Sequence, residues 1–114
     1  MLSRSSRLHQ RTDFRTATRA GRRVGAAGLV LHAYVDTTGS CDPARKVGFV
    51  VGRAVGPAVT RNQVRRRLRH LVAERLDRMP AGARLVVRAT PSAAGRSFAA
   101  LGASLDAALA KAYR

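Results

Sequence analysis

Aromatic residues and cysteine are scarce, and each shortage excludes a class of design. The chain has no Trp, two Tyr and three Phe, so we do not expect a broad aromatic platform for stacking nucleic-acid bases. Cys41 is the single cysteine, which excludes a disulfide within the chain and a cysteine cluster for zinc. We interpret it as a loop thiol without a role, in keeping with a reducing cytoplasm.

Acidic residues are also scarce, and this shortage indicates the kind of partner. Only 6 Asp and Glu oppose 22 Lys and Arg, which gives a formal charge of +16. Such an excess favours a polyanionic partner. Nucleic acid is the expected partner, and an anionic membrane surface is the alternative. All basic residues except Lys46 and Lys111 are Arg, whose planar guanidinium binds phosphate through two N–H groups.

Long apolar runs and catalytic motifs are missing as well. No apolar run approaches the roughly 20 residues that span a bilayer, and the basic N-terminus lacks the apolar segment of a signal peptide. We find no P-loop and no zinc-protease motif. Glu74 and Asp77 lie beside Arg75 and Arg78, which predicts an ion-paired surface. We therefore expect no catalytic group and no direct metal ligand in this chain, no membrane partner and a cytoplasmic location.

The hydrophobic pattern predicts one α/β domain over residues 1–114, with residues 1–10 flexible. Strands are expected at 28–36, 45–53 and 83–89, and helices at 58–78 and 93–113, after a short helix from Thr12 or Asp13 to Gly21. The turn-rich loop at 37–43 predicts an antiparallel hairpin of the first two strands. The last helix is expected to bury one face, which carries Phe98, Leu101, Leu105, Ala108, Leu109 and Ala112.

The helix predicted at 58–78 is the densest basic element. Pro57 stands at its start, where a missing N–H costs nothing, and the free N–H groups of a helix N-terminus attract phosphate. On a helical wheel, the apolar stripe anchors the helix to the sheet. Asn62, Arg66 and Arg69 point away from it, and Arg65 flanks them. The second face of the strand at 28–36 carries Val30, His32 and Tyr34. A half-buried sheet face with a satisfied His is one interpretation, and a shallow wall for a nucleotide is the other.

These motifs resemble a known family. Arg61–Arg69, RNQVRRRLR, resembles the arginine-asparagine signature of the bacterial ribonuclease P protein component. KVGFVVGRAVGPAVTRN before it and LVVRATP near Pro91 are similar to the family's strand–turn–helix entry and its last strand. The resemblance extends over most of the chain.

The resemblance implies a fold and an activity. The fold would be a ribosomal-protein-like, two-layer α+β sandwich, a small mixed sheet packed with helices and a left-handed βαβ crossover, against the usual right-handed preference. The protein would join a large catalytic RNA, which with Mg²⁺ cleaves the 5′ leader from precursor transfer RNA. The alternative is a structural RNA-binding protein of ribosomal or assembly type without a leader cleft. A DNA-binding role has little support.

The resemblance also implies two sets of site residues. The signature residues would lie near the catalytic RNA and its metals: Arg61, Asn62, Arg65, Arg66 and Arg69. Residues at the positions of the family's leader cleft are Phe14, Val30, His32, Phe49, Val51 and Arg53. Gln63 stands where the family commonly has a second Arg, a loss of charge that Arg65 to Arg67 partly restore. His32 replaces a frequent aromatic residue, so we expect leader stacking to be weaker here, or to rely on Phe14, His32 and charge.

Overall fold

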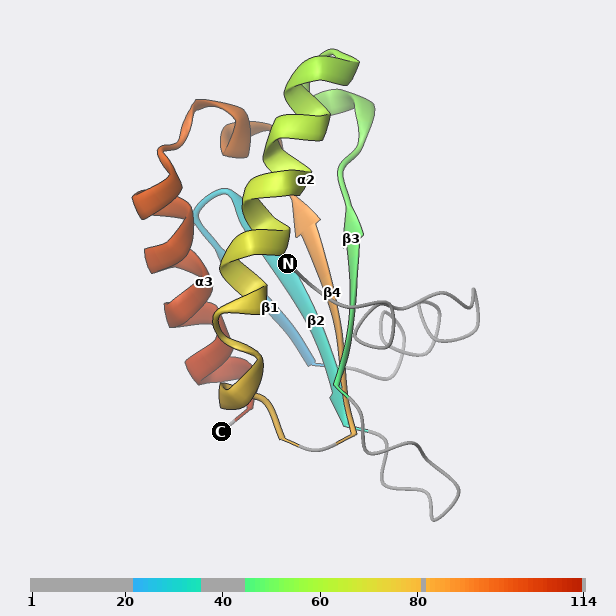
Figure 1. Cartoon of the computed structure of the whole chain (residues 1–114), viewed down its shortest axis with the longest axis vertical. Coiled ribbons are helices and arrows are strands. Elements are labelled where there is room, and N and C mark those ends of the chain that lie inside the picture. The colour runs from blue at the N-terminus through green and yellow to red at the C-terminus, as the bar shows by residue number, and fades with distance from the viewer. Residues whose placement is uncertain (1–21, 36–44, 81, 114) are drawn as a thin grey trace.

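The described part of the computed structural model consists of a four-stranded sheet with two α-helices on one of its faces (Figure 1). It covers residues 22–35, 45–80 and 82–113. The strands are β1 (Arg22–Ala26), β2 (Leu29–Val35), β3 (Lys46–Val50) and β4 (Ala83–Ala89). The helices are α2 (Ala58–Ala73) and α3 (Phe98–Ala112), and the 3-10 turns are η2 (Arg53–Val55), η3 (Leu76–Arg78) and η4 (Pro91–Gly95). The predicted helix before Gly21, residues 1–10 and Phe14 lie outside the described residues.

The strand order is β1-β2-β4-β3, so the predicted hairpin of the strands now labelled β2 and β3 is wrong. β4 lies between them, antiparallel to β2 and parallel to β3. The burial of β4 fits this central place. Leu85 and Val87 are fully buried on the helix side of the sheet, and Val86 is fully buried on the opposite side. β2 instead forms its hairpin with β1, which the sequence analysis missed, and the tight turn uses Gly28 at φ +87°.

The connection from β3 through α2 to β4 is a left-handed crossover. β3 and β4 are parallel and run upward in Figure 1, α2 lies in front of the sheet, and β4 lies to the left of β3. A right-handed crossover would place β4 to the right, as in nearly all βαβ units. The mixed two-layer α+β fold expected from the family resemblance is confirmed.

One hydrophobic core fills the space between the sheet and the two helices. The inner face of the sheet contributes alternate residues of β2 and β4, among them Leu29, Leu31 and Leu85, each with no exposed surface. The helices contribute the stripes that their 3.6-residue period predicts: Val64, Leu68, Leu71 and Val72 from α2, and Leu101, Leu105, Ala108, Leu109 and Ala112 from α3. The core therefore fixes which side of α2 faces away from the protein.

Both helices are shorter than predicted, and one expected core residue is exposed. α2 ends at Ala73, where the Arg75 amide bonds to Val72 O at 2.9 Å and the chain tightens into η3. α3 begins only at Phe98, because Ser97 caps it: the Ser97 Oγ accepts a hydrogen bond from the Ala100 amide at 3.1 Å. Phe98 therefore stands at the helix end and is 41% exposed, so its predicted burial is wrong.

An ion-pair cluster joins the end of α2 to α3. Asp106 on α3 accepts hydrogen bonds from Arg75, and from Arg78 Nη1 at 2.7 Å. The bond from Arg75 is the main reason that the pKa of Asp106 lies below its usual value. Glu74 lies 3.6 Å from Arg75, in agreement with the predicted ion-paired surface, but Asp106 lies closer to Arg75 than Glu74 does. In the part of the chain described here, no helix is long and apolar enough to cross a membrane.

Candidate nucleic-acid interface

The first candidate surface is the exposed side of α2, which begins at a sharp turn. Gly56 adopts φ +153°, where an added Cβ would lie 3.1 Å from Thr60. Pro57 follows at the N-cap, without a side-chain hydrogen bond to the helix, and the first turn has no acidic residue. The amides of this turn are therefore available for an anion.

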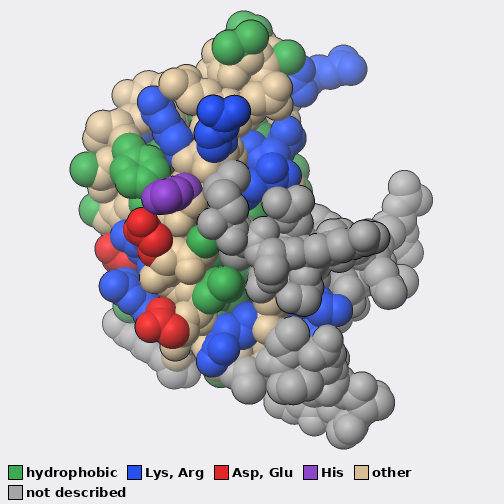
Figure 2. Space-filling view, viewed as in Figure 1, with side chains coloured by type: hydrophobic (Ala, Val, Ile, Leu, Met, Phe, Trp, Pro, Cys, Tyr) green, Lys and Arg blue, Asp and Glu red, His purple; other side chains and the backbone are tan. Residues whose placement is uncertain are grey.

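The five predicted signature residues lie on α2. Asn62 and Arg66 are exposed, whereas Arg61, Arg65 and Arg69 are half-buried. The Arg65 Nη1 donates a hydrogen bond to the Asn62 Oδ1 at 3.3 Å, which holds the two side chains together. Figure 2 shows basic side chains without acidic neighbours over the upper part of α2, whereas the acidic side chains lie lower, next to further Lys and Arg side chains. This separation leaves the basic part of α2 suited to phosphate.

The second candidate surface is the face of the sheet opposite α2 and α3, which we call the second face. The registers place nine side chains from the strands on it: Arg23, Val30, His32, Tyr34, Lys46, Val50, Arg84, Val86 and Arg88. Val86 is fully buried beneath Tyr34 and Val50, which form a small second core. Arg23 and Arg88 are exposed beside half-buried Val30 and Val50. An apolar floor with cations at its edge suits a single strand, whose bases and phosphates need different contacts.

His32 occupies the centre of the second face, between Arg23 on β1 and Val86 on β4. Its side chain is 8% exposed, and its Nδ1 has no hydrogen-bond partner among the described residues. Burial lowers the pKa of His32, and the positive charges of Arg88 and Arg23 lower it further. These effects favour the neutral imidazole. The prediction of a half-buried sheet face is confirmed, but the Nδ1 of this His is not satisfied by the described chain.

The six predicted leader-cleft residues do not all come together. Val30 and His32 share the second face, but Phe49 and Val51 pack into the core on the helix side of the sheet. Arg53 is exposed in η2, and Phe14 lies outside the described residues. The division follows from the alternation of a strand, which sends Phe49 to the face opposite its neighbour Val50.

Sequence reasoning missed several members of the second face. β1 was not predicted, so Arg23 was not considered, and the roles of Arg84 and Arg88 were not recognised. The alternation of Arg84, Val86 and Arg88 in β4 was a usable signal, because it gives one face of that strand two cations around a valine. Assigning them to the side of His32 required the register between β2 and β4.

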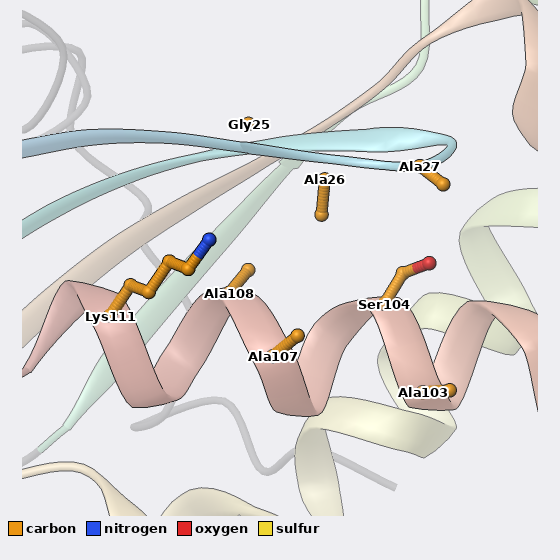
Figure 3. A pocket seen from close by; sticks show the side chains of 8 residues that line it. All are labelled: Gly25, Ala26, Ala27, Ala103, Ser104, Ala107, Ala108 and Lys111. Atoms are coloured by element: carbon orange, nitrogen blue, oxygen red, sulfur yellow. The ribbon is translucent and has the colours of Figure 1, made fainter.

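A further hollow of about 360 Å³ lies between the β1–β2 turn and α3 (Figure 3). It is lined by Gly25, Ala26, Ala27, Ala103, Ser104, Ala107, Ala108 and Lys111. The small side chains let the hairpin and the helix approach closely, as the Ala-rich pattern of the last helix suggested. Ser104 and Lys111 alone among them carry polar side-chain atoms, so this hollow offers little chemistry.

The two surfaces carry cations suited to phosphates, and few acidic side chains lie near them in the described ranges. Among the described residues, no group of three His, Cys, Asp or Glu side chains could hold a metal ion. The acids that are described lie in ion pairs or at the opposite end of the helices from the basic part of α2. The fold and both surfaces define a basic α+β protein with two cationic surfaces suited to a polyanion.

Comparisons with known proteins agree with that class. The sequence model of the Ribonuclease P family matches residues 2–113. The ribonuclease P protein component of Salinispora tropica is 51% identical over 98% of this chain and 93% of its own length. That of Streptomyces bikiniensis is 50% identical over 96% of this chain and 93% of its own length. The chain belongs to the ribonuclease P family, and the predicted identity as its protein component is confirmed.

Solved structures show the same fold. The RNase P protein of Staphylococcus aureus superposes with a TM-score of 0.81 at 23% identity, covering 96% of this chain and 98% of the other. The fold is thus retained where most side chains differ.

Proposed function

We propose that this chain is the subunit of ribonuclease P that binds both the catalytic RNA and the 5′ leader of precursor transfer RNA. The observation that carries the proposal is the presence of two cationic surfaces on opposite sides of one sheet. α2 lies on one side, and the second face lies on the other. One protein can therefore contact two RNA segments at once.

The α2 surface is assigned to the catalytic RNA. Arg61, Asn62, Arg65, Arg66 and Arg69 lie on one helix beside the unoccupied amides of its first turn. Of these side chains, Asn62 is the one typical of hydrogen bonds to base edges, whereas the four Arg side chains can bind phosphates. This composition fits recognition of RNA shape rather than sequence. Gln63 is exposed next to them and adds no charge, and Arg67 adds one positive charge to the four Arg residues of the signature.

The second face is assigned to the leader. Arg23 and Arg88 would hold phosphates, while Val30 and Val50 provide apolar contact above the buried His32. Arg53 follows β3 in η2 and would extend the cationic edge. Phe49 and Val51 support this face from within the core. Few aromatic rings are available, so charge carries most of the affinity.

Cleavage is assigned to the RNA subunit and its Mg²⁺. Two metal ions on phosphate oxygens can activate water and stabilise a leaving oxygen. The donor set described here does not fit a magnesium cage, because its acids are dispersed and paired with Arg. This chain would position RNA and neutralise its charge, in the cytoplasm where precursor transfer RNA is processed.

Reconstitution tests the proposal. The protein is mixed with a bacterial ribonuclease P RNA and a leader-bearing precursor at a Mg²⁺ concentration where the RNA alone cleaves slowly. We expect faster removal of the leader with the protein present, and no cleavage by the protein alone. No gain over RNA alone would overturn the proposal. Cleavage without added RNA would assign the catalytic groups to this chain instead.

A further inference from the structure

A separate hollow lies where the start of α3 meets α2. It measures about 330 Å³ and is lined by Arg66, Arg67, His70 and Phe98. Phe98 and Val59 are the large hydrophobic side chains that stand exposed in the described part of the chain. Val59 lines a different hollow, with Asn62, Gln63 and Arg66, whereas Phe98 lines this one. An exposed aromatic ring can stack on a flat ligand, and the two guanidinium groups beside it can bind an anionic group of the same ligand.

The walls of this hollow are held in place by contacts on both helices. Ser97 caps α3 immediately before Phe98, which fixes the start of that helix. The Arg67 Nη1 donates to the Arg96 carbonyl oxygen at 3.4 Å, so α2 is tied to the segment that leads into Phe98. Such a hollow exists before a ligand arrives, and binding there costs little reorganisation.

His70 completes the arrangement. Its ring centroid lies 5.7 Å from that of Phe98, at an interplanar angle of 56°. Its Nε2 lies 3.1 Å from the Glu74 Oε1, which orients the imidazole and places the carboxylate at the edge away from the Arg pair. A phosphate would therefore bind on the side of Arg66 and Arg67, and the ring on the side of Phe98.

We propose that this hollow binds one unpaired nucleobase of the RNA partner, stacked on Phe98, with an adjoining phosphate held by Arg66. Aromatic side chains and Arg bind unpaired bases in this way in many RNA-binding proteins. A membrane surface fits less well, because insertion needs an apolar stripe and Phe98 is a single ring among cations.

The occupant comes from the catalytic RNA rather than from the leader. The hollow lies on the helix side of the sheet, opposite the second face to which the leader is assigned. Arg66 belongs both to this hollow and to the signature, so the two contacts adjoin on α2. This choice of RNA rests on the proposed function, whereas the stacking of a base rests on the hollow alone.

Replacement of Phe98 provides a direct probe of stacking. The chain has no Trp, so the Phe98→Trp variant has a single indole at the proposed contact. Titration with a bacterial ribonuclease P RNA, and separately with a short single-stranded RNA, should quench its fluorescence. Unchanged fluorescence at saturating concentrations of both RNAs would overturn the proposal.

Affinity measurements give a second readout. Phe98→Ala should weaken binding of the ribonuclease P RNA by about 5- to 150-fold, the range that base–aromatic stacking spans. Phe98→Tyr keeps the ring and should bind within about twofold of the native chain on the same grounds. Ser104→Ala, in the small hollow between the β1–β2 turn and α3 and away from both RNA surfaces, should leave the affinity unchanged. Equal affinities for all four proteins, with thermal unfolding unchanged, would refute the proposal.

The two proposals fail separately. If the native protein stimulates leader cleavage but Phe98→Ala binds the RNA normally, only the base site is wrong. If Phe98→Trp is quenched by single-stranded RNA but the native protein does not stimulate cleavage, the base site stands and the proposed function falls.

Discussion

Replacing Arg66 by Ala removes one exposed cation from α2 and should reduce the salt dependence of RNA binding. Among the described residues, Arg66 has no hydrogen-bond or ion-pair partner, so its loss breaks no such bond between them. Each phosphate contact releases counterions, and its loss lowers the slope of log K against log salt by about 0.7 to 0.9. Since an exposed charge is screened by salt, we expect a loss of affinity of only about 1 kcal/mol, or about fivefold.

Arg78→Ala is the matched control for this prediction. Arg78 is also an exposed arginine, with 57% of its side chain accessible, but its Nη1 lies 2.7 Å from the Asp106 Oδ1 at the acidic end of the helices. Its removal changes the net charge by the same amount without removing a proposed phosphate contact.

Binding of a bacterial ribonuclease P RNA, measured by filter retention at five salt concentrations, gives both slopes. The slope for Arg66→Ala should fall, and that for Arg78→Ala should match the native protein. Equal slopes for Arg66→Ala and native protein would place this side chain away from RNA and refute the reasoning. A similar fall in both variants would show that net charge, and not the α2 surface, sets the affinity.

Three other predictions concern stability and protonation. Leu105→Ala should lower the free energy of unfolding by about 2 to 5 kcal/mol in urea titrations, because Leu105 is fully buried between α3 and the sheet. Asp106→Asn should weaken the ion pair with Arg75. Because the pKa of Asp106 is lowered in the folded protein, this ion pair stabilises the fold at neutral pH, and the stabilisation is lost as the pH falls below about 4. The thermal unfolding temperatures of native and variant proteins should therefore differ at pH 7 and converge below about pH 4. His32 should titrate below its usual 6.5 in NMR spectra, and a midpoint above that value would contradict its burial beside Arg23 and Arg88.

The outward side of α2 was predictable because the helical period alone determines which residues share a face. Once Val64, Leu68 and Leu71 are recognised as apolar, the 3.6-residue period fixes Arg66 on the other side. The exact end of α2 was not predictable, because the apolar pattern continues to Leu76 and Met79, beyond the last helical residue Ala73. The same limit applies to Phe98, whose exposure follows from where α3 begins.

The order of the strands in the sheet was harder to predict from the sequence. Alternation separates the two faces of one strand, and it correctly separated Leu31 from His32. It does not say which strands pair. The turn-rich loop at 37–43 favoured a hairpin, but β4 lies between β2 and β3, with Leu85 and Val87 buried on the helix side and Val86 buried on the second face. The second face therefore emerges only when the registers bring Arg23, His32 and Arg88 together.

The affinity of the reconstituted complex for two forms of transfer RNA tests the central claim most directly. The claim predicts that a leader-bearing precursor binds more tightly than mature transfer RNA. Arg88→Ala, on the second face, should reduce this difference. Arg66→Ala, on α2, should weaken assembly with the catalytic RNA but keep the difference once the complex has formed. Equal affinity of the native complex for precursor and mature transfer RNA would contradict the account and favour a structural RNA-binding protein without a leader site.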